Sequence, residues 1–344
     1  MNDIYEALNH VSMDLDDYTP VPLEAGEAKR QTDRLLAADK KERPALRVHR
    51  RRWPVLAAAA ALTACLAVGA GAAHSWSGDF AAFLGLGGAV DSLGDMSLGL
   101  VLSQTLSGGT VTLEGVLGDD YCIYVPFTVE APEGQVLDGT LDYGFDNCTL
   151  YSDASDGMVQ HMEMLPDDDP TDNKLRFVMM ASSTKPLRGE MAEATVWNLF
   201  SYPTDTSRLH DEDAVVPGRF EFSFRLDYED RSVVVCDRNT DVGLGWPLAR
   251  LELSPVSVYL ELDGLPENEM NPAFDTSIVL IGADGSRQEL VSDWDYEQTG
   301  EGIPGLSFSQ DEKAVRMLLQ AIDPAQYAAV EVNGVSFPLE KAAG

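Results

Sequence analysis

The sequence predicts a mainly β protein, in which β-sandwich-like domains follow one transmembrane helix and a short helical N-terminal arm. Three observations carry this prediction: apolar and polar residues alternate in the second half of the chain, an uncharged run lies near residue 60, and the charge differs on its two sides. The 344 residues include 57 Asp or Glu against 24 Lys or Arg, a net charge of -33. Such a surface repels a polyanion, which excludes a general nucleic-acid-binding protein.

The predicted N-terminal arm comprises residues 1–53. It carries as many acidic as basic side chains, so the net negative charge belongs to the rest of the chain. Ile4, Leu8 and Val11 recur at three- and four-residue spacing beside Tyr5, which predicts a short amphipathic helix. A segment of this length cannot bury a core of its own, and we expect it to become helical on a partner.

The predicted transmembrane helix comprises residues 54–74, where no charged residue occurs. A helix of that length spans ~30 Å, the thickness of a bilayer's hydrocarbon core. The predicted membrane-anchor flanks are Arg50, Arg51, Arg52, Trp53 and Trp76. Because the arginines all precede the run, we expect a cytoplasmic N-terminus and an extracellular C-terminal part in a cell membrane, in contact with lipid.

Other interpretations of residues 54–74 remain open. The run is rich in alanine, which contributes little insertion energy, and a buried helix in a soluble protein has the same composition. Cleavage after Ala72, or acylation of Cys65, would turn the run into a processed leader. Small residues spaced four apart, such as Ala67 and Gly71, suit the close approach of two helices and thus a homodimer.

Beyond the run we expect a juxtamembrane linker at 75–94, a β-sandwich domain at 95–246 and a smaller β domain at 247–344. Two half-buried strands are predicted by alternation, with Phe220, Phe222, Phe224 and Leu226 in one and Val256, Val258, Leu260 and Leu262 in the other. Strand-forming residues also fill 122–129.

Turn signals separate these predicted strands. Gly108-Gly109, Gly118-Asp119-Asp120 and Asp284-Gly285 are expected turns, and Asn333-Gly334 between apolar runs predicts a hairpin. Within the smaller domain, the spacing of apolar residues predicts a short helix over 311–322.

The sequence contains no nucleophile elbow, zinc-protease helix, phosphate loop or dinucleotide fingerprint, so we expect no enzyme and no cofactor. The acidic stretch 167–173 lacks the glycine and glutamate that a calcium-binding EF-hand loop requires. We expect no metal site there, with weak Ca²⁺ binding as the alternative to a solvated loop. Cys122, Cys148 and Cys236 permit at most one disulfide, and their spacing does not choose the pair.

The amphipathic helix of the arm is the predicted partner-binding site. Its apolar face is expected to enter a groove, with acidic residues matching a basic rim. The predicted contact residues are Ile4, Tyr5, Leu8, Val11, Asp3, Glu6, Asp14, Asp16 and Asp17. The alternative is a disordered tail whose basic end only fixes membrane orientation.

The first 18 residues, the basic flank before a single span, and the outer segment 111–134 resemble a family of Gram-positive bacterial membrane proteins. These proteins carry an extracytoplasmic domain of unknown function and are regarded as anti-sigma factors for extracytoplasmic-function sigma factors. The resemblance implies that residues 1–52 hold a sigma factor inactive while the outer domain senses the envelope. The chain lacks the His-x-x-x-Cys-x-x-Cys pattern of zinc-containing anti-sigma domains, so the contact is expected to be metal-free.

The resemblance therefore predicts a membrane-anchored, anti-sigma-factor-like regulator of transcription that makes no direct contact with nucleic acid. The alternative is a tethered extracellular β-sandwich module that binds cell wall or another ligand and has no sigma-factor partner.

Overall fold

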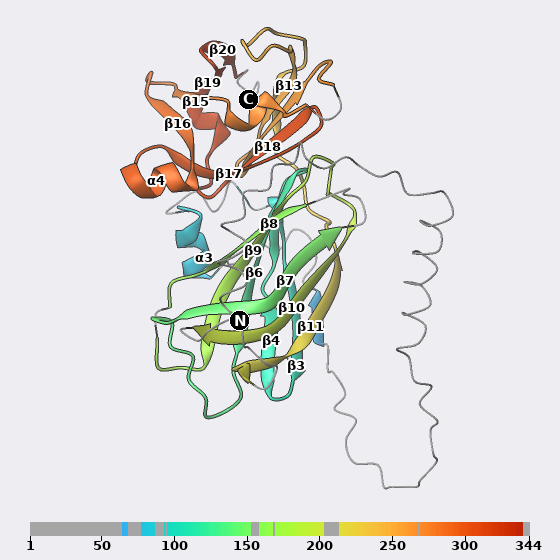
Figure 1. Cartoon of the computed structure of the whole chain (residues 1–344), viewed down its shortest axis with the longest axis vertical. Helices are drawn as coiled ribbons and strands as arrows, with labels where there is room; N and C mark the ends of the chain where they lie inside the picture. The colour runs from blue at the N-terminus through green and yellow to red at the C-terminus, as the bar shows by residue number, and fades with distance from the viewer. Residues whose placement is uncertain are drawn as a thin grey trace, which may run out of the picture. The chain divides into compact units, whose positions relative to one another are not determined.

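A computed structural model describes residues 64–67, 77–86, 93, 95–152, 158–167, 169–202, 213–266 and 269–339 of the protein. All of these residues belong to one compact unit, 59–344. They form two β domains, so the prediction of a mainly β protein is confirmed. Strands β1 to β11 build the N-terminal domain, and strands β12 to β20 build the C-terminal domain (Figure 1).

The N-terminal domain contains an eight-stranded and a three-stranded sheet. The larger sheet has the order β1-β3-β4-β6-β5-β2, with β9 on β6 and β8 on β9; the smaller has the order β11-β10-β7. Their strands are β1 (Ala64–Ala67), β2 (Ser97–Leu98), β3 (Leu100–Leu106), β4 (Gly109–Leu113), β5 (Val116–Gly118), β6 (Cys122–Glu130), β7 (Asp142–Ser152), β8 (Val159–Met164), β9 (Lys174–Ser182), β10 (Met191–Tyr202) and β11 (Val216–Arg225).

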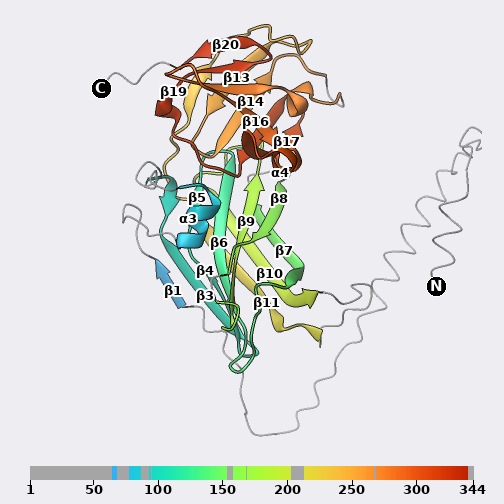
Figure 2. The same cartoon turned by 90° about the vertical axis from the view of Figure 1, so that its left-hand side faces the viewer.

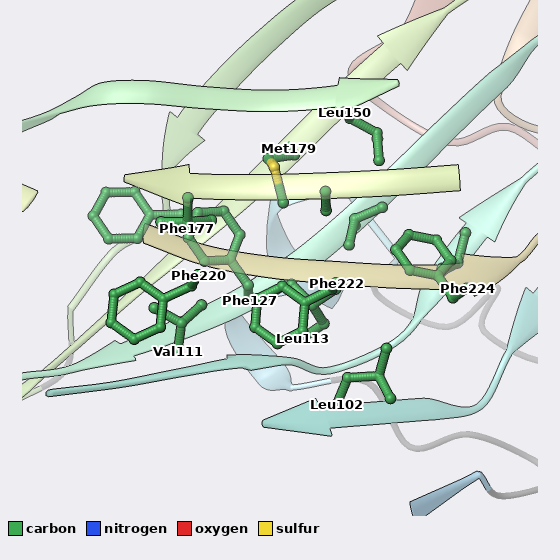
Figure 3. Packing of buried hydrophobic residues seen from close by; sticks show 14 of the residues in the cluster. Leu102, Val111, Leu113, Phe127, Leu150, Phe177, Met179, Phe220, Phe222 and Phe224 are labelled. Atoms are coloured by element: carbon green, nitrogen blue, oxygen red, sulfur yellow. The ribbon is translucent and has the colours of Figure 1, made fainter. Parts of the chain in front are cut away.

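The two sheets face each other across a hydrophobic core (Figure 3). The predicted alternation in β11 is confirmed, because Phe220, Phe222 and Phe224 are buried while the residues between them are exposed. The rings of Phe127 and Phe177 stack with centroids 5.4 Å apart. At one edge, the backbone N–H of Glu221 in β11 donates to the side chain of Gln104 in β3, so the sheets nearly close into a barrel.

The C-terminal domain is one nine-stranded sheet with the order β12-β13-β14-β18-β17-β16-β15-β19-β20. Only β16 and β17 pair in parallel. Its elements are β12 (Val233–Cys236), β13 (Leu248–Leu253), β14 (Ser257–Leu262), η5 (Pro272–Asp275), β15 (Ile278–Gly282), β16 (Arg287–Ser292), α4 (Asp293–Thr299), β17 (Ile303–Gln310), β18 (Lys313–Leu318), η6 (Pro324–Gln326), β19 (Tyr327–Val332) and β20 (Val335–Pro338). The sheet thus begins at Val233, within the range 95–246 predicted for the first domain.

The helix predicted over 311–322 is wrong. Residues 313–318 form β18, a central strand between β14 and β17. Ala314 and Leu318 pack into the core of the C-terminal domain, whereas Val315 and Met317 pack into a different cluster on the opposite face. A strand buried on both faces carries a continuous apolar run, and such a run satisfies helical spacing as well.

The predicted turns lie between strands. β19 and β20 form the predicted hairpin, with Asn333 at φ 47° and Gly334 at φ 83°. Positive φ at both central positions is the geometry that favours an Asn-Gly pair. The β3–β4 turn is centred one residue earlier than predicted, on Ser107 and Gly108, because both of these have positive φ.

The transmembrane helix predicted for 54–74 is not supported. Residues 64–67 form strand β1, antiparallel to β3, with Ala64 opposite Ser103 and Ala67 opposite Leu100. Alanine prefers helices to strands by intrinsic propensity, so pairing with β3, rather than local preference, accounts for this strand. None of the helices in the described ranges is long and apolar enough to cross a bilayer. The remaining residues of 54–74 lie outside the described part of the chain.

Part of the range predicted as a linker is folded into the protein. Helix α3 (Gly78–Phe83) begins after Ser77, whose hydroxyl accepts a hydrogen bond from the N–H of Phe80. Phe80 and Leu84 are fully buried rather than exposed near a lipid surface. These two apolar residues of the expected linker therefore face a protein interior.

Candidate functional site

The residues predicted to contact a partner, at positions 3–17, and the predicted membrane flanks at 50–53 and 76 lie outside the described residues. The strongest concentration of buried polar chemistry in the described part lies elsewhere, between the two β domains. We call this region the joint.

The joint is a third hydrophobic cluster, separate from the cores of the two domains. It receives side chains from three sources: the α3 segment, strands β5, β6 and β9 of the N-terminal domain, and β14 and β18 of the C-terminal domain. Figure 2 shows α3 beside strands β5 and β6 of the N-terminal domain. Its central members are Phe80, Leu84, Leu117, Tyr124, Val178, Met180, Val256, Tyr259, Val315 and Met317.

Asp119 is the one fully buried carboxylate among the described acidic residues. It lies in the tight turn between β5 and β6, and Gly118 precedes it. A side chain at Gly118 would approach the carbonyl oxygen of Cys122 to 2.5 Å and the hydroxyl of Tyr228 to 3.0 Å. Only glycine therefore lets the turn fold tightly enough to place Asp119 inside the joint.

The carboxylate of Asp119 accepts hydrogen bonds from both domains. Oδ1 accepts from the backbone N–H groups of Tyr121 at 2.8 Å and Cys122 at 2.7 Å. Oδ2 accepts from the hydroxyls of Ser254 and Ser257 in the C-terminal domain, the latter at 2.6 Å. This set of contacts, the Asp119 clasp, ties the two domains together through one side chain.

Ser254 is held so that it must donate to Asp119. Its Oγ accepts from the backbone N–H groups of Val256 at 3.0 Å and Ser257 at 2.8 Å. Both lone pairs of the hydroxyl are thus engaged, and its proton is left for the carboxylate. The loop 254–257 is therefore shaped to present donors to an acceptor from the other domain.

Burial raises the pKa of Asp119 to about 6. The hydrogen bonds from Ser254, Ser257 and Tyr121 lower it, and the charge of Asp230 adds a smaller upward effect. Glu252 and Asp120 also carry negative charge near the joint, and they are bound to Arg250 and Arg188 respectively. The carboxyl therefore changes its charge within the mildly acidic range.

Aromatic side chains add further contacts between the domains. The hydroxyl of Tyr124 donates to the carbonyl oxygens of Leu318 at 2.6 Å and Val256 at 3.2 Å. The ring of Tyr121 stacks on that of Tyr259, with centroids 4.0 Å apart and planes 9° apart. Burial raises the pKa of both stacked tyrosines, so their hydroxyls stay protonated.

The α3 segment is bound to both domains. Asp79 forms an ion pair with Arg176 in β9 of the N-terminal domain. The backbone N–H of Ala321, just after β18, donates to the carbonyl oxygen of Leu84 at 2.9 Å. With Phe80 buried in the joint, the chain that immediately follows the apolar run is held at the place where the domains meet.

A cavity of about 370 Å³ opens beside the joint and is lined by residues of α3, β8 and α4. On its wall, His161 Nε2 lies 3.0 Å from the carboxylate of Glu163. That carboxylate raises the pKa of His161, and Asp293 adds to the effect. His161 lies on strand β8.

The cysteines and the acidic stretch 167–173, which the sequence suggested as candidates for a disulfide and a metal site, form neither in the described residues. Cys122, Cys148 and Cys236 are free thiols in the structure, and burial raises the pKa of Cys148 to about 12. In the acidic stretch, Asp167 accepts from the N–H of Gly139 and Asp172 from that of Lys174. No group of three or more metal-ligating side chains occurs in the described ranges.

The sequence identified Asp119 only as a turn residue. Its serine partners lie 135 and 138 positions away, so no local pattern links them. The one available signal was the setting of Asp119, between the apolar residues of β5 and the strand-forming stretch that begins at Cys122. An acid in such a setting is either a solvated loop residue or a buried carboxylate with distant partners.

Comparisons with known proteins assign no family. No family model matches the chain, and no curated protein shows significant similarity to it. The crystal structure of the conserved domain protein from Bacillus anthracis is similar at a TM-score of 0.46 and 14% identity, covering 70% of this chain and 78% of that one. A likeness at this level supports no conclusion about function.

Proposed function

We propose that the protein is a membrane-anchored, anti-sigma-factor-like regulator. In this proposal the N-terminal arm holds a sigma factor on the cytoplasmic side, and the paired β domains respond to a signal outside the cell. The proposal draws on the segregated charge of the chain and on the resemblance of its N-terminal and outer segments to such regulators.

The structural observation that favours it is the position of α3. This helix directly follows the apolar run and contacts both β domains through Asp79, Leu84 and Phe80. A change in how the two domains meet would therefore displace the chain next to the membrane. That is the connection that a signal needs in order to reach the arm.

Membrane anchoring through the apolar run would require a change in strand β1. Residues 64–67 cannot pair with β3 and lie in a bilayer at the same time. Insertion of the run requires β1 to leave the sheet, which exposes β3 as an edge strand. A reporter fused to the C-terminus should then be active outside the cell; activity restricted to the cytosol would contradict anchoring.

The test of function is capture of a sigma factor by the full-length chain in non-ionic detergent. We expect the wild-type protein to retain a sigma factor and the double variant Ile4→Asp, Leu8→Asp to lose it, because two charges disrupt the apolar face of the arm. The matched control, Val21→Asp with Leu23→Asp, places the same charges outside that face and should retain capture. Undiminished capture by the arm variant, or none by the wild type, would overturn the proposal in favour of a tethered binding module.

A further inference from the structure

A groove runs along α4 in the C-terminal domain. Two cavities, of about 460 and 820 Å³, share the wall residues Ser277, Glu289, Val291 and Asp295. Together they form a continuous depression lined by α4 and strands β16 and β17, which we call the α4 groove. The volume of each cavity is typical of a ligand-binding site and too large for a packing defect.

The groove arises because β16 and β17 separate. They pair in parallel at three positions only, from Leu290 opposite Ile303 to Ser292 opposite Gly305, and then β17 continues along β18. Arg316 from β18 occupies the space that opens between them. Its Nη1 donates to the carbonyl oxygen of Leu290 at 2.9 Å, and its Nε donates to Ser307 at 3.1 Å.

Negative charge dominates the rim of the groove. Glu289, Asp295 and Glu301 are exposed on its walls. Of the two cations among its described lining residues, Arg316 is buried in the floor, and Arg287 forms a two-point ion pair with Glu331 at 2.6 and 3.1 Å. An anionic ligand would be repelled at this rim, whereas a cationic one would be attracted.

Two further features point to a bound partner. Thr276 lines the smaller cavity and is 3% exposed, and its hydroxyl has no hydrogen-bond partner among the described residues. An unsatisfied buried hydroxyl destabilises the protein, and a ligand group bonded to it would remove that penalty. At the rim, Trp294 is 68% exposed and lies between Asp293 and Asp295 in the sequence.

We propose that the α4 groove binds a lysine- and arginine-rich peptide. The carboxylates of Glu289 and Asp295 pair with its charged groups, and the face of Trp294 takes up an ammonium or guanidinium group together with its aliphatic stem. The hydroxyl of Thr276 bonds to a polar group of the peptide that reaches the smaller cavity. The inference rests on the proposed function only in placing the groove outside the cell, where it names the class of signal.

Binding is tested on the full-length chain in non-ionic detergent with fluorescein-labelled decalysine, followed by anisotropy. We expect the double variant Glu289→Gln, Asp295→Asn to bind about tenfold more weakly, since two charge contacts are lost. Trp294→Ala should bind roughly threefold more weakly. The matched control Glu133→Gln, Glu193→Gln removes the same charge from exposed positions of the N-terminal domain and should change affinity less than about twofold.

Equal losses in the groove and control variants would overturn the proposal, because the attraction would then be spread over the whole acidic surface. Salt-independent competition by a neutral oligosaccharide that requires Trp294 would overturn it in favour of a glycan site. Thermal unfolding verifies that each variant is folded. Sigma-factor capture is measured without peptide, so failure of either experiment leaves the other interpretable.

Discussion

The core of the N-terminal domain and the joint are both buried, but different forces stabilise them. Between the two sheets of the domain, stacked phenylalanine rings and aliphatic side chains fill the space. In the joint, a fully buried carboxylate and two serine hydroxyls lie beside the apolar cluster. Apolar packing depends little on pH, whereas a buried carboxyl titrates. The molecule thus combines a pH-independent core with a contact between domains that responds to its surroundings.

The largest expected effect is the difference in unfolding free energy between a substitution in the core of the N-terminal domain and one on its surface. Phe127 is fully buried against Phe177, and replacing it with alanine should lower the free energy of unfolding by about 3–5 kcal/mol, because the cavity cannot collapse between two sheets. The matched control is Leu141→Ala at a residue that is 41% exposed, with an expected loss below about 1 kcal/mol. Denaturant titration of the full-length chain measures both. Similar losses in the two variants would contradict the assignment of the core.

The second prediction concerns pH and the joint. Because the pKa of Asp119 in the folded protein is raised to about 6 from an ordinary 3.8, the folded state binds the proton more tightly than the unfolded state. This group's contribution to stability is full below about pH 4 and is lost as the pH rises towards 6, by an amount on the order of 3 kcal/mol.

Comparison with a variant isolates that contribution. Asp119→Asn should abolish the fall in unfolding free energy between pH 4 and 6 relative to wild type. The control Asp237→Asn, at an exposed position, should preserve it. If the wild-type and Asp119→Asn profiles run parallel, Asp119 does not titrate in the joint.

How far the sequence predicts these two regions follows from where each residue's partners lie. The alternation of Phe220, Phe222 and Phe224 with polar residues predicts a strand from the local sequence, because this pattern is typical of a strand with one buried face. The local sequence of residues 313–318 did not predict a strand, because both faces of β18 are buried and its apolar residues do not alternate with polar ones. The Asp119 clasp could not be predicted from the sequence, because a carboxylate and its donors from another domain leave no periodic pattern.

The smallest predicted effect removes one hydrogen-bonding group from the joint. Tyr124→Phe deletes the hydroxyl that donates to Leu318 and Val256 and should cost about 1 kcal/mol while leaving the ring packed. Tyr151→Phe, at a residue that is 50% exposed, is the matched control and should be neutral. Denaturant titration again reports the difference; equal stability of the Tyr124 variant and wild type would show that this bond contributes nothing between the domains.

Hydrogen exchange in Asp119→Ala tests most directly whether the joint couples α3 to both domains. The decisive amide is that of Ala321, which donates to Leu84 and makes no contact with Asp119 in the structure. We predict that it exchanges about a hundredfold faster in the variant, together with the amides of Tyr121 and Cys122, while the amide of Phe222 in β11 keeps its wild-type rate. Unchanged protection at Ala321, or equal acceleration at Phe222, would contradict the account.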